Sequence, residues 1–194
     1  MKPSRYNLRS EPIPDITIGP AGPSDIPRLI EVDVAAGQLF APTGLLNDEA
    51  LKDHVPRHIM QEAIRSHRLD VARVPDGRAV GFTLVSLKPT ALYLDQISVH
   101  PEYGRSGIGR SLMRQLVTKA RELGQTRIVL STFRDVEWNG PFYASLGYKP
   151  VQRTDYEPFM IDIEKAQAPF MDVSKRIFMR KRIRKPFIRA KKPV

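Results

Sequence analysis

The residues with the clearest capacity for chemistry form a glycine-rich loop, Gly104-Arg105-Ser106-Gly107-Ile108-Gly109-Arg110. An apolar helical period begins at the end of this loop, so we expect the loop to lead into the first turn of a helix. The first backbone N–H groups of a helix have no partner within it, and the helix dipole makes that end positive. Glycines let a phosphate approach the backbone, and the two arginines add positive charge. The loop therefore predicts a binding site for a phosphate-bearing ligand.

The order of the glycines distinguishes between known classes of phosphate loop. A P-loop ends in Gly-Lys followed by Ser or Thr, whereas this loop ends in Gly109-Arg110-Ser111. A Rossmann fingerprint has the order G-x-G-x-x-G, and this chain has G-x-x-G-x-G. An acid is also expected near the end of the next strand of a Rossmann unit, where Ser131 and Thr132 stand. Both of these nucleotide-binding classes are therefore disfavoured.

Two longer segments carry a resemblance to a known family. Residues 97–112, ISVHPEYGRSGIGRSL, closely resemble the central motif of the GCN5-related N-acetyltransferases, and residues 138–148, WNGPFYASLGY, resemble the motif that follows it. The resemblance in element order covers about residues 16 to 183. One departure is visible: the family often has Gln or Arg where this chain has Gly104. The backbone contact there should persist, with Arg105 partly replacing the lost side chain.

The resemblance implies that acetyl-CoA is the acyl donor and that no metal is needed. The backbone of Ile97, Ser98 and Val99 should bind the pantetheine and polarise the acetyl carbonyl. The pyrophosphate should lie on the loop, against Gly104, Arg105, Ser106, Gly107, Ile108, Gly109 and Arg110. Asn139 matches a position that contacts the cofactor arm. Tyr143, also beside the cofactor, matches the tyrosine that protonates the departing thiolate.

The general base is not identified by the motifs. Asp95 lies on the strand before the loop, where simple alternation places it on the same face as Ile97. Glu31 lies on the first helix, which borders the acceptor in related folds, and the sequence does not separate these two candidates. Asp33 on the same helix and Glu137 are further alternatives. The acceptor amine itself has no readable code.

Periodicity and turn signals predict the elements that position these residues. Runs 69–74 and 79–87 are joined by Pro75-Asp76-Gly77-Arg78, which predicts a hairpin, and run 91–99 extends it into an antiparallel meander. Strand 91–99, helix 107–123 and strand 126–132 predict a right-handed β-α-β crossover with parallel strands. The other predicted elements are a strand at 16–18, helices at 26–40, 48–67 (interrupted at Pro56), 138–146 and around 160–166, and strands at 148–153 and 176–183.

The expected fold class is α/β (α+β). The resemblance specifies a GNAT fold with a mixed, mostly antiparallel twisted sheet of six to seven strands, a central β-α-β acetyl-CoA-binding unit and flanking helices. We expect an irregular N-terminal arm at 1–14, an N-acetyltransferase domain at 15–183 and a basic tail at 184–194. The sequence leaves the oligomeric state open, a homodimer included.

Composition limits the remaining classes of function. The chain has 194 residues, no cysteine and a formal net charge of +10, with much of that charge between Arg180 and Lys192. The absence of cysteine excludes a disulfide and a thiolate nucleophile. The chain has neither an apolar run of membrane-spanning length nor a secretory signal pattern, so we expect a cytoplasmic protein without a membrane partner. The alternative to an enzyme is a catalytically silent acyl-CoA-binding module whose basic tail engages nucleic acid or another anionic partner.

Overall fold

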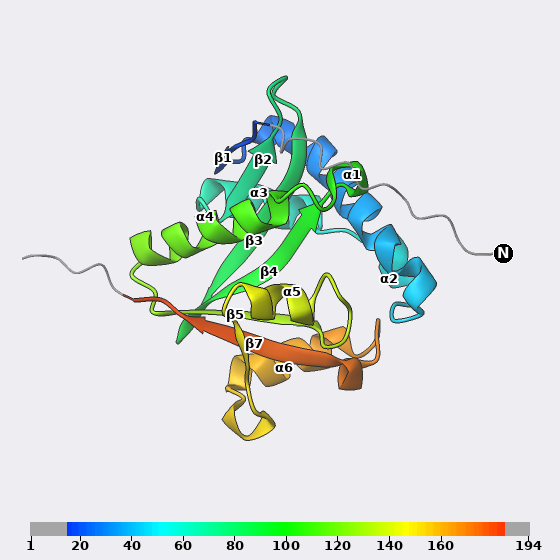
Figure 1. Ribbon diagram of the computed structural model, residues 1–194, viewed down its shortest axis with the longest axis vertical. Helices are drawn as coiled ribbons and strands as arrows, with labels where there is room; N and C mark the ends of the chain where they lie inside the picture. The colour runs from blue at the N-terminus through cyan, green and yellow to red at the C-terminus, as the bar shows by residue number, and fades with distance from the viewer. Residues whose placement is uncertain (1–14, 185–194) are drawn as a thin grey trace, which may run out of the picture.

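The computed structural model describes residues 15–184 and contains one seven-stranded sheet in the order β1-β2-β3-β4-β5-β7-β6. The strands are β1 (Thr17–Pro20), β2 (Leu69–Arg73), β3 (Ala79–Lys88), β4 (Ala91–Val99), β5 (Arg127–Phe133), β6 (Lys149–Pro150) and β7 (Arg176–Arg182). All neighbouring pairs are antiparallel except β4 and β5, which are parallel. Figure 1 shows the sheet running from β1 near the top to β7 near the bottom. The predicted fold class is confirmed. The predicted arm at 1–14 and nearly all of the predicted tail lie outside the described residues.

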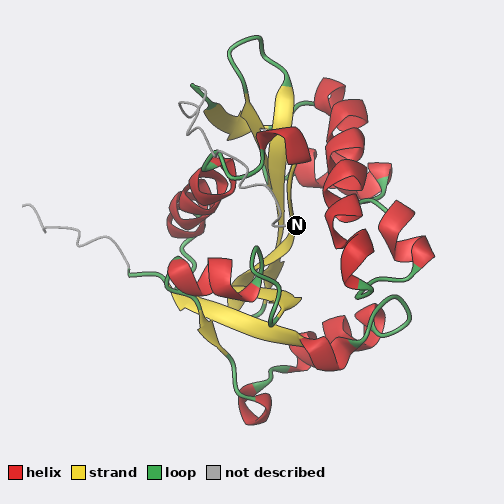
Figure 2. Cartoon of the chain, turned by 45° about the vertical axis from the view of Figure 1, so that its right-hand side comes forward, coloured by secondary structure: helices red, strands yellow, loops and turns green. Residues whose placement is uncertain are grey.

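Helices cover both faces of this sheet, as Figure 2 shows. They are α1 (Ile26–Gly37), α2 (Asp48–Lys52), α3 (Arg57–Arg65), α4 (Ile108–Glu122), α5 (Gly140–Ser145) and α6 (Pro158–Gln167). On one face, α4 and α5 pack on the centre of the sheet through residues such as Met113, Leu116 and Tyr143. On the other face, α1 and α3 cover β2 and β3, whereas α6 covers β5 and β7. The two halves of the sheet therefore have separate helical covers on this second face.

Local chemistry explains where the observed elements differ from the predicted ones. The helix predicted at 48–67 is broken as expected, because Pro56 directly precedes α3. The first helix ends at Gly37 and continues only as a 3-10 turn, Gln38–Thr43, which contains Pro42. The strand predicted at 148–153 is reduced to Lys149–Pro150, since proline has no N–H for the ladder and a 3-10 turn follows at Arg153. No described helix is both long and apolar enough to cross a membrane.

Strands β4 and β5 separate in the middle of the sheet. Their pairing covers only Leu92–Leu94 of β4 and Ile128–Leu130 of β5. Beyond these residues β4 stays paired with β3, and β5 stays paired with β7. The sheet is therefore split from Asp95 and Ser131 onward, and this split creates the site.

Candidate active site

The split leaves one backbone edge of β4 open. Residues 96–99 of β4 pair with residues 81–84 of β3 along one edge, and no described strand pairs with the other edge. Alternate N–H and C=O groups of a strand point to opposite edges, so part of this backbone faces the opening. An extended ligand can add to such an edge as a further strand does. The residues predicted to bind pantetheine, Ile97 to Val99, lie on this edge.

A β-bulge at the start of the split changes which way Asp95 points. Leu84 pairs with Gln96 and Val85 with Leu94, so Asp95 is the extra residue in β4. Its carboxylate accepts a 3.0 Å hydrogen bond from Ser86 on β3, whereas Ile97 packs on the opposite face with α4. The prediction that Asp95 shares a face with Ile97 is therefore wrong. Simple alternation fails at a bulge, because one strand gains a residue.

The surroundings of Asp95 change its acidity. Although the side chain of Asp95 is exposed at the cleft, desolvation by the surrounding protein raises its pKa to about 6, and the Ser86 hydroxyl and the charges of Lys88 and Arg68 act in the opposite direction. A carboxylate with this pKa is largely ionised at neutral pH, yet it is a better proton acceptor than an ordinary aspartate. Asp95 therefore has both the position and the basicity of a general base.

Asp33 has a different environment from Asp95. Its side chain is buried, with 4% exposed. One carboxylate oxygen accepts from Ser98 Oγ (2.6 Å) and Gln96 Nε2 (2.7 Å), and the other accepts from the backbone N–H of Val55 (2.8 Å). These bonds tie α1 to the open part of β4 and to the segment before α3. Asp33 lines the cleft, and its two carboxylate oxygens also hold the strand in place.

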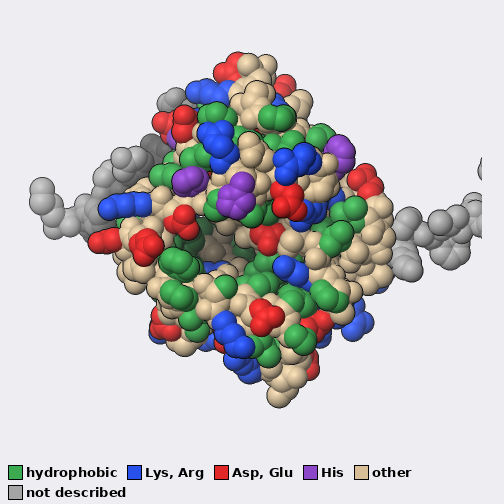
Figure 3. All heavy atoms as spheres, turned by 180° about the vertical axis from the view of Figure 1, so that it is seen from behind, with side chains coloured by type: hydrophobic (Ala, Val, Ile, Leu, Met, Phe, Trp, Pro, Cys, Tyr) green, Lys and Arg blue, Asp and Glu red, His purple; other side chains and the backbone are tan. Residues whose placement is uncertain are grey.

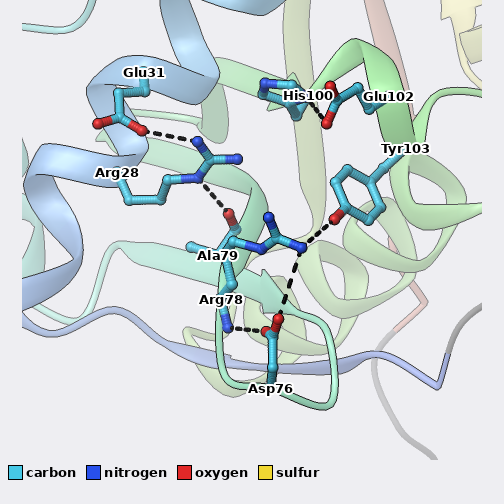
Figure 4. A network of polar contacts seen from close by, with 8 residues as sticks. All are labelled: Arg28, Glu31, Asp76, Arg78, Ala79, His100, Glu102 and Tyr103. Carbon is cyan, nitrogen blue, oxygen red and sulfur yellow. Dashed lines mark hydrogen bonds and ion pairs between the residues drawn. The ribbon is translucent and has the colours of Figure 1, made fainter.

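Glu31 lies outside the cleft. Its side chain is 63% exposed and pairs with Arg28 at 2.8 Å. Figure 4 shows this pair beside α1, with Arg28 also donating to the carbonyl of Ala79. Glu31 is not among the residues that line the cleft. Of the two base candidates that the sequence left unseparated, the geometry favours Asp95.

The glycine-rich loop has the backbone geometry of an anion site. Gly107 adopts a left-handed conformation (φ 84°) just before α4 begins at Ile108, and Arg105 is also left-handed (φ 59°). The N–H of Ser111 bonds to the carbonyl of Gly107, so the N–H groups of residues 108–110 precede the first α-helical hydrogen bond. No side chain caps this helix end among the described residues. These N–H groups are therefore available to an anion.

The structure also explains why glycine occupies position 104. A Cβ at Gly104 would lie 2.9 Å from the carbonyl oxygen of Pro101, closer than ordinary contact allows. The turn after β4 would have to shift to accept Gln or Arg here. Arg105 is 74% exposed, and the nearest carboxylate, that of Glu137, lies at 3.6 Å. Arg105 can therefore turn toward a bound phosphate in place of the missing side chain.

Asn139 and Tyr143 approach the cleft from the β5 side. Thr132, beyond the paired part of β5, donates a 2.7 Å hydrogen bond to Oδ1 of Asn139, which orients the amide. The next residue must be small, because a Cβ at Gly140 would lie 2.2 Å from the carbonyl oxygen of Arg134. Tyr143 is packed between Phe142 and Tyr148, and burial raises its pKa. Its phenol therefore stays protonated at neutral pH and can donate a proton.

These residues meet in one cleft of about 650 Å³. Asp95, Ile97, Ser98, Asn139 and Tyr143 all line it. Figure 3, which views the molecule from behind relative to Figure 1, shows a hollow with hydrophobic, acidic and basic side chains around it. A methyl group on Gly109 would lie 3.6 Å from the ring of Phe142 and 4.0 Å from Val99, so the start of α4 adjoins both α5 and the end of β4. The phosphate loop is thus next to the open strand edge.

The cleft also contains residues that the sequence did not single out as functional. Arg176, at the start of β7, lines the cleft, as do Phe133 and Gln167. Phe40 packs on Phe133, with ring centroids 5.4 Å apart, and on Trp138 at 5.8 Å. Trp138 begins the second family motif, but no motif marks Arg176, Phe133, Gln167 or Phe40, because they come from segments far apart in the chain.

Comparison with known proteins agrees with this geometry. The Acetyltransferase (GNAT) family profile matches residues 41–148, which is more than half of the chain. The chain therefore belongs to the GNAT acetyltransferase family.

Solved structures with the same fold share little sequence with this chain. N-acetylglutamate synthase from Neisseria gonorrhoeae, complexed with coenzyme A and N-acetyl-glutamate, matches with a TM-score of 0.66 and 17% identity. The match covers 88% of this chain but 35% of the Neisseria chain, so this chain spans about a third of that protein. PaiA N-acetyltransferase from Thermoplasma acidophilum, in complex with coenzyme A, matches with a TM-score of 0.63 and 17% identity over 87% and 99% of the two chains. The ribosomal-protein-S18-alanine N-acetyltransferase from Escherichia coli matches with a TM-score of 0.61 and 16% identity over 91% and 99%.

Proposed function

We propose that this protein is an N-acetyltransferase that transfers the acetyl group of acetyl-CoA to a primary amine of a small molecule or peptide. The observation that carries the proposal is the open edge of β4, which has the bare N-terminus of α4 at one end and Asp95 and Tyr143 beside it. In this proposal the start of α4 binds the phosphates, and the adjoining cleft supplies a strand edge for the pantetheine, a base and an acid. Structural neighbours that contain coenzyme A support the choice of donor.

The reaction proceeds by direct attack in a ternary complex. Asp95 accepts a proton from the acceptor's ammonium group, directly or through one water molecule. The neutral nitrogen then forms a bond to the thioester carbon, and backbone N–H groups of β4 stabilise the oxyanion. The nitrogen loses its second proton to water, the C–S bond breaks, and Tyr143 protonates the sulfur. The Tyr143 phenolate regains a proton from solvent, so the products are the amide, coenzyme A and one released proton.

Both small molecules and peptides remain in the proposed acceptor class, since the names of the structural neighbours cover both kinds. One of these neighbours is named for the synthesis of N-acetylglutamate, and another for the alanine of a ribosomal protein. The non-catalytic alternative depended on the charge between Arg180 and Lys192, half of which lies outside the described residues. No feature of the described part of the chain favours that alternative.

The deciding experiment is a thiol-release assay with acetyl-CoA and a panel of polyamines, aminoglycosides, amino acids and peptides with free N-termini. We expect release of coenzyme A that depends on one class of amine. Tight binding of acetyl-CoA without release in the presence of any amine would overturn the enzymatic proposal.

A further inference from the structure

Arg176 is a positive charge in the cleft without an acidic partner. Its side chain lines the cavity, and among residues 15–184 it forms no ion pair. Other arginines with comparably low exposure do have partners: Arg73 pairs with Asp25 at 2.6 Å, and Arg127 pairs with Glu157 at 3.1 Å. Arg68 also lines the cleft, but it pairs with Glu62 at 3.1 Å, so the lack of a carboxylate distinguishes Arg176 from it as well.

The guanidinium group of Arg176 is held rigidly by neutral groups. Nε donates to Ser131 Oγ at 3.0 Å, and Nη2 donates to the Ser131 carbonyl at 2.9 Å. The group also stacks over the ring of Phe133, at 4.7 Å from its centroid. Ser131 Oγ donates in turn to Gln167 Oε1 at 3.1 Å, which fixes the hydroxyl. Nη1 has no hydrogen-bond partner within the described part of the chain.

This environment makes the charge costly in the empty protein. Burial lowers the pKa of Arg176, because desolvation disfavours the cation. The neighbouring phenols of Tyr93 and Tyr143 do not neutralise it, since burial raises the pKa of each and keeps both protonated. A ligand carboxylate would restore the missing counter-charge, and its bonds to a guanidinium are stronger than neutral hydrogen bonds.

We propose that the acceptor carries a carboxylate that binds Arg176, so that the substrate is an amino acid or another amine with a carboxylate in the same molecule. This inference rests on the proposed acetyltransferase function. The charges of Arg176 and Asp95 both act on Tyr93, and all three residues line the cleft. The acceptor thus directs its amine toward Asp95 and its carboxylate toward Arg176, with Phe40 and Phe133 beside its apolar part.

The test compares each amino acid with its own amide in the thiol-release assay, using the wild type, Arg176→Gln and Arg176→Lys. In the wild type, we expect kcat/KM to be roughly 10- to 100-fold higher for the acid, as for a charge-assisted pair in a cleft. Arg176→Gln should abolish that preference while activity on the amide persists, and Arg176→Lys should restore part of it. Arg180→Gln is the matched control, because Arg180 lies on the same strand outside the cleft lining and pairs with Asp155.

A binding measurement keeps this inference separate from the enzymatic proposal. Calorimetry on the coenzyme A complex compares the N-acetyl derivatives of the twenty common amino acids with their carboxamides. Preferential binding of acids, lost in Arg176→Gln, supports the carboxylate site even if no amine releases thiol. The carboxylate site is overturned if the enzyme releases thiol equally well with acids and amides, or if Arg176→Gln lowers the activity on both equally. Either result leaves the acetyltransferase proposal standing. The absence of any preference in both assays also overturns the carboxylate site.

Discussion

The hydroxyl of Ser98 on β4 donates a 2.6 Å hydrogen bond to the carboxylate of Asp33 on α1. Gln96 donates to the same oxygen at 2.7 Å. The strand edge proposed to hold the acetyl carbonyl is thus anchored from behind by a helix distant in the sequence. A buried carboxylate thus anchors the edge at which the oxyanion is proposed to form.

Asp33→Ala removes this anchor and leaves the N–H group of Val55, the amide of Gln96 and the hydroxyl of Ser98 without their common acceptor. We expect the free energy of unfolding to fall by about 3–5 kcal/mol, because breaking a buried charged network leaves its partners unsatisfied. Urea denaturation measures the change. Glu31→Ala, on the same helix with an exposed ion pair, should cost no more than about 1 kcal/mol. Equal effects of the two substitutions would contradict the anchoring role.

Asp95→Asn should lower kcat by about 10²- to 10⁴-fold, the usual contribution of a positioned base. Since the base must be deprotonated, the activity of the wild type should rise with pH through about 6. Asp95→Asn should lack this acidic limb. Glu31→Gln, which alters the other base candidate, should retain both the rate and the limb. A pH profile of kcat/KM distinguishes these outcomes.

Ser86→Ala tests the origin of that acidic limb. The hydrogen bond from Ser86 stabilises the ionised form of Asp95 and holds down its pKa. Removing the hydroxyl should therefore raise the pKa of Asp95 and move the limb to higher pH. If the limb does not move in Ser86→Ala, it belongs to another group.

The raised pKa of Asp95 also affects stability. Because its folded-state pKa exceeds its ordinary value, ionisation of Asp95 disfavours folding as the pH rises from about 4 to about 6.

Tyr143→Phe should retain affinity for acetyl-CoA and lose most of the turnover, because the proposed role of the phenol is to protonate the departing thiolate and the aromatic ring is kept. Tyr148→Phe is the matched control. The hydroxyl of Tyr148 is buried without a hydrogen-bond partner in the described residues, so its removal should leave turnover unchanged and stabilise the fold. Stopped-flow kinetics and thermal denaturation measure the two effects. Unchanged turnover in Tyr143→Phe would remove Tyr143 from the acid role.

Gly107→Ala should weaken acetyl-CoA binding, because alanine disfavours the left-handed backbone (φ 84°) that presents the start of α4. The strain is about 1–2 kcal/mol, which corresponds to a loss in affinity of roughly 5- to 30-fold if the loop relaxes to avoid it. Gly124→Ala is a suitable control, since Gly124 is also left-handed (φ 66°) but lies at the other end of α4. That variant should lose stability but not affinity, as calorimetry with acetyl-CoA would show.

Local sequence patterns were sufficient to predict those elements whose structure depends on interactions between neighbouring residues. The period of Ile108, Leu112 and Leu116 predicted α4, which ends at Glu122 just before the left-handed Gly124. Pro56 predicted the break between α2 and α3 because proline acts on its immediate neighbours. The glycine spacing of the loop and the motif around Tyr143 indicated the family, and the family profile confirms it.

The features that the sequence did not predict depend on contacts between segments distant in the chain. The register between β3 and β4 inserts Asp95 as a bulge, and no pattern within β4 alone reveals that insertion. The separation of Asp95 from Glu31 as base candidates followed only from the packing of α1. In the sequence, Arg176 was only the first residue of the strand predicted at 176–183, and β7 places it beside Ser131 and Phe133.

The sequence alone thus determined the membership of the family and predicted the phosphate loop, because such a loop is made of consecutive residues whose backbone angles follow from their types. Only the tertiary structure decided the acceptor side. The charges proposed to bind the acceptor, Asp95 and Arg176, come from β4 and β7, and their burial depends on how distant segments pack. The acceptor is accordingly inferred from an unpaired charge in a folded cleft rather than from a motif.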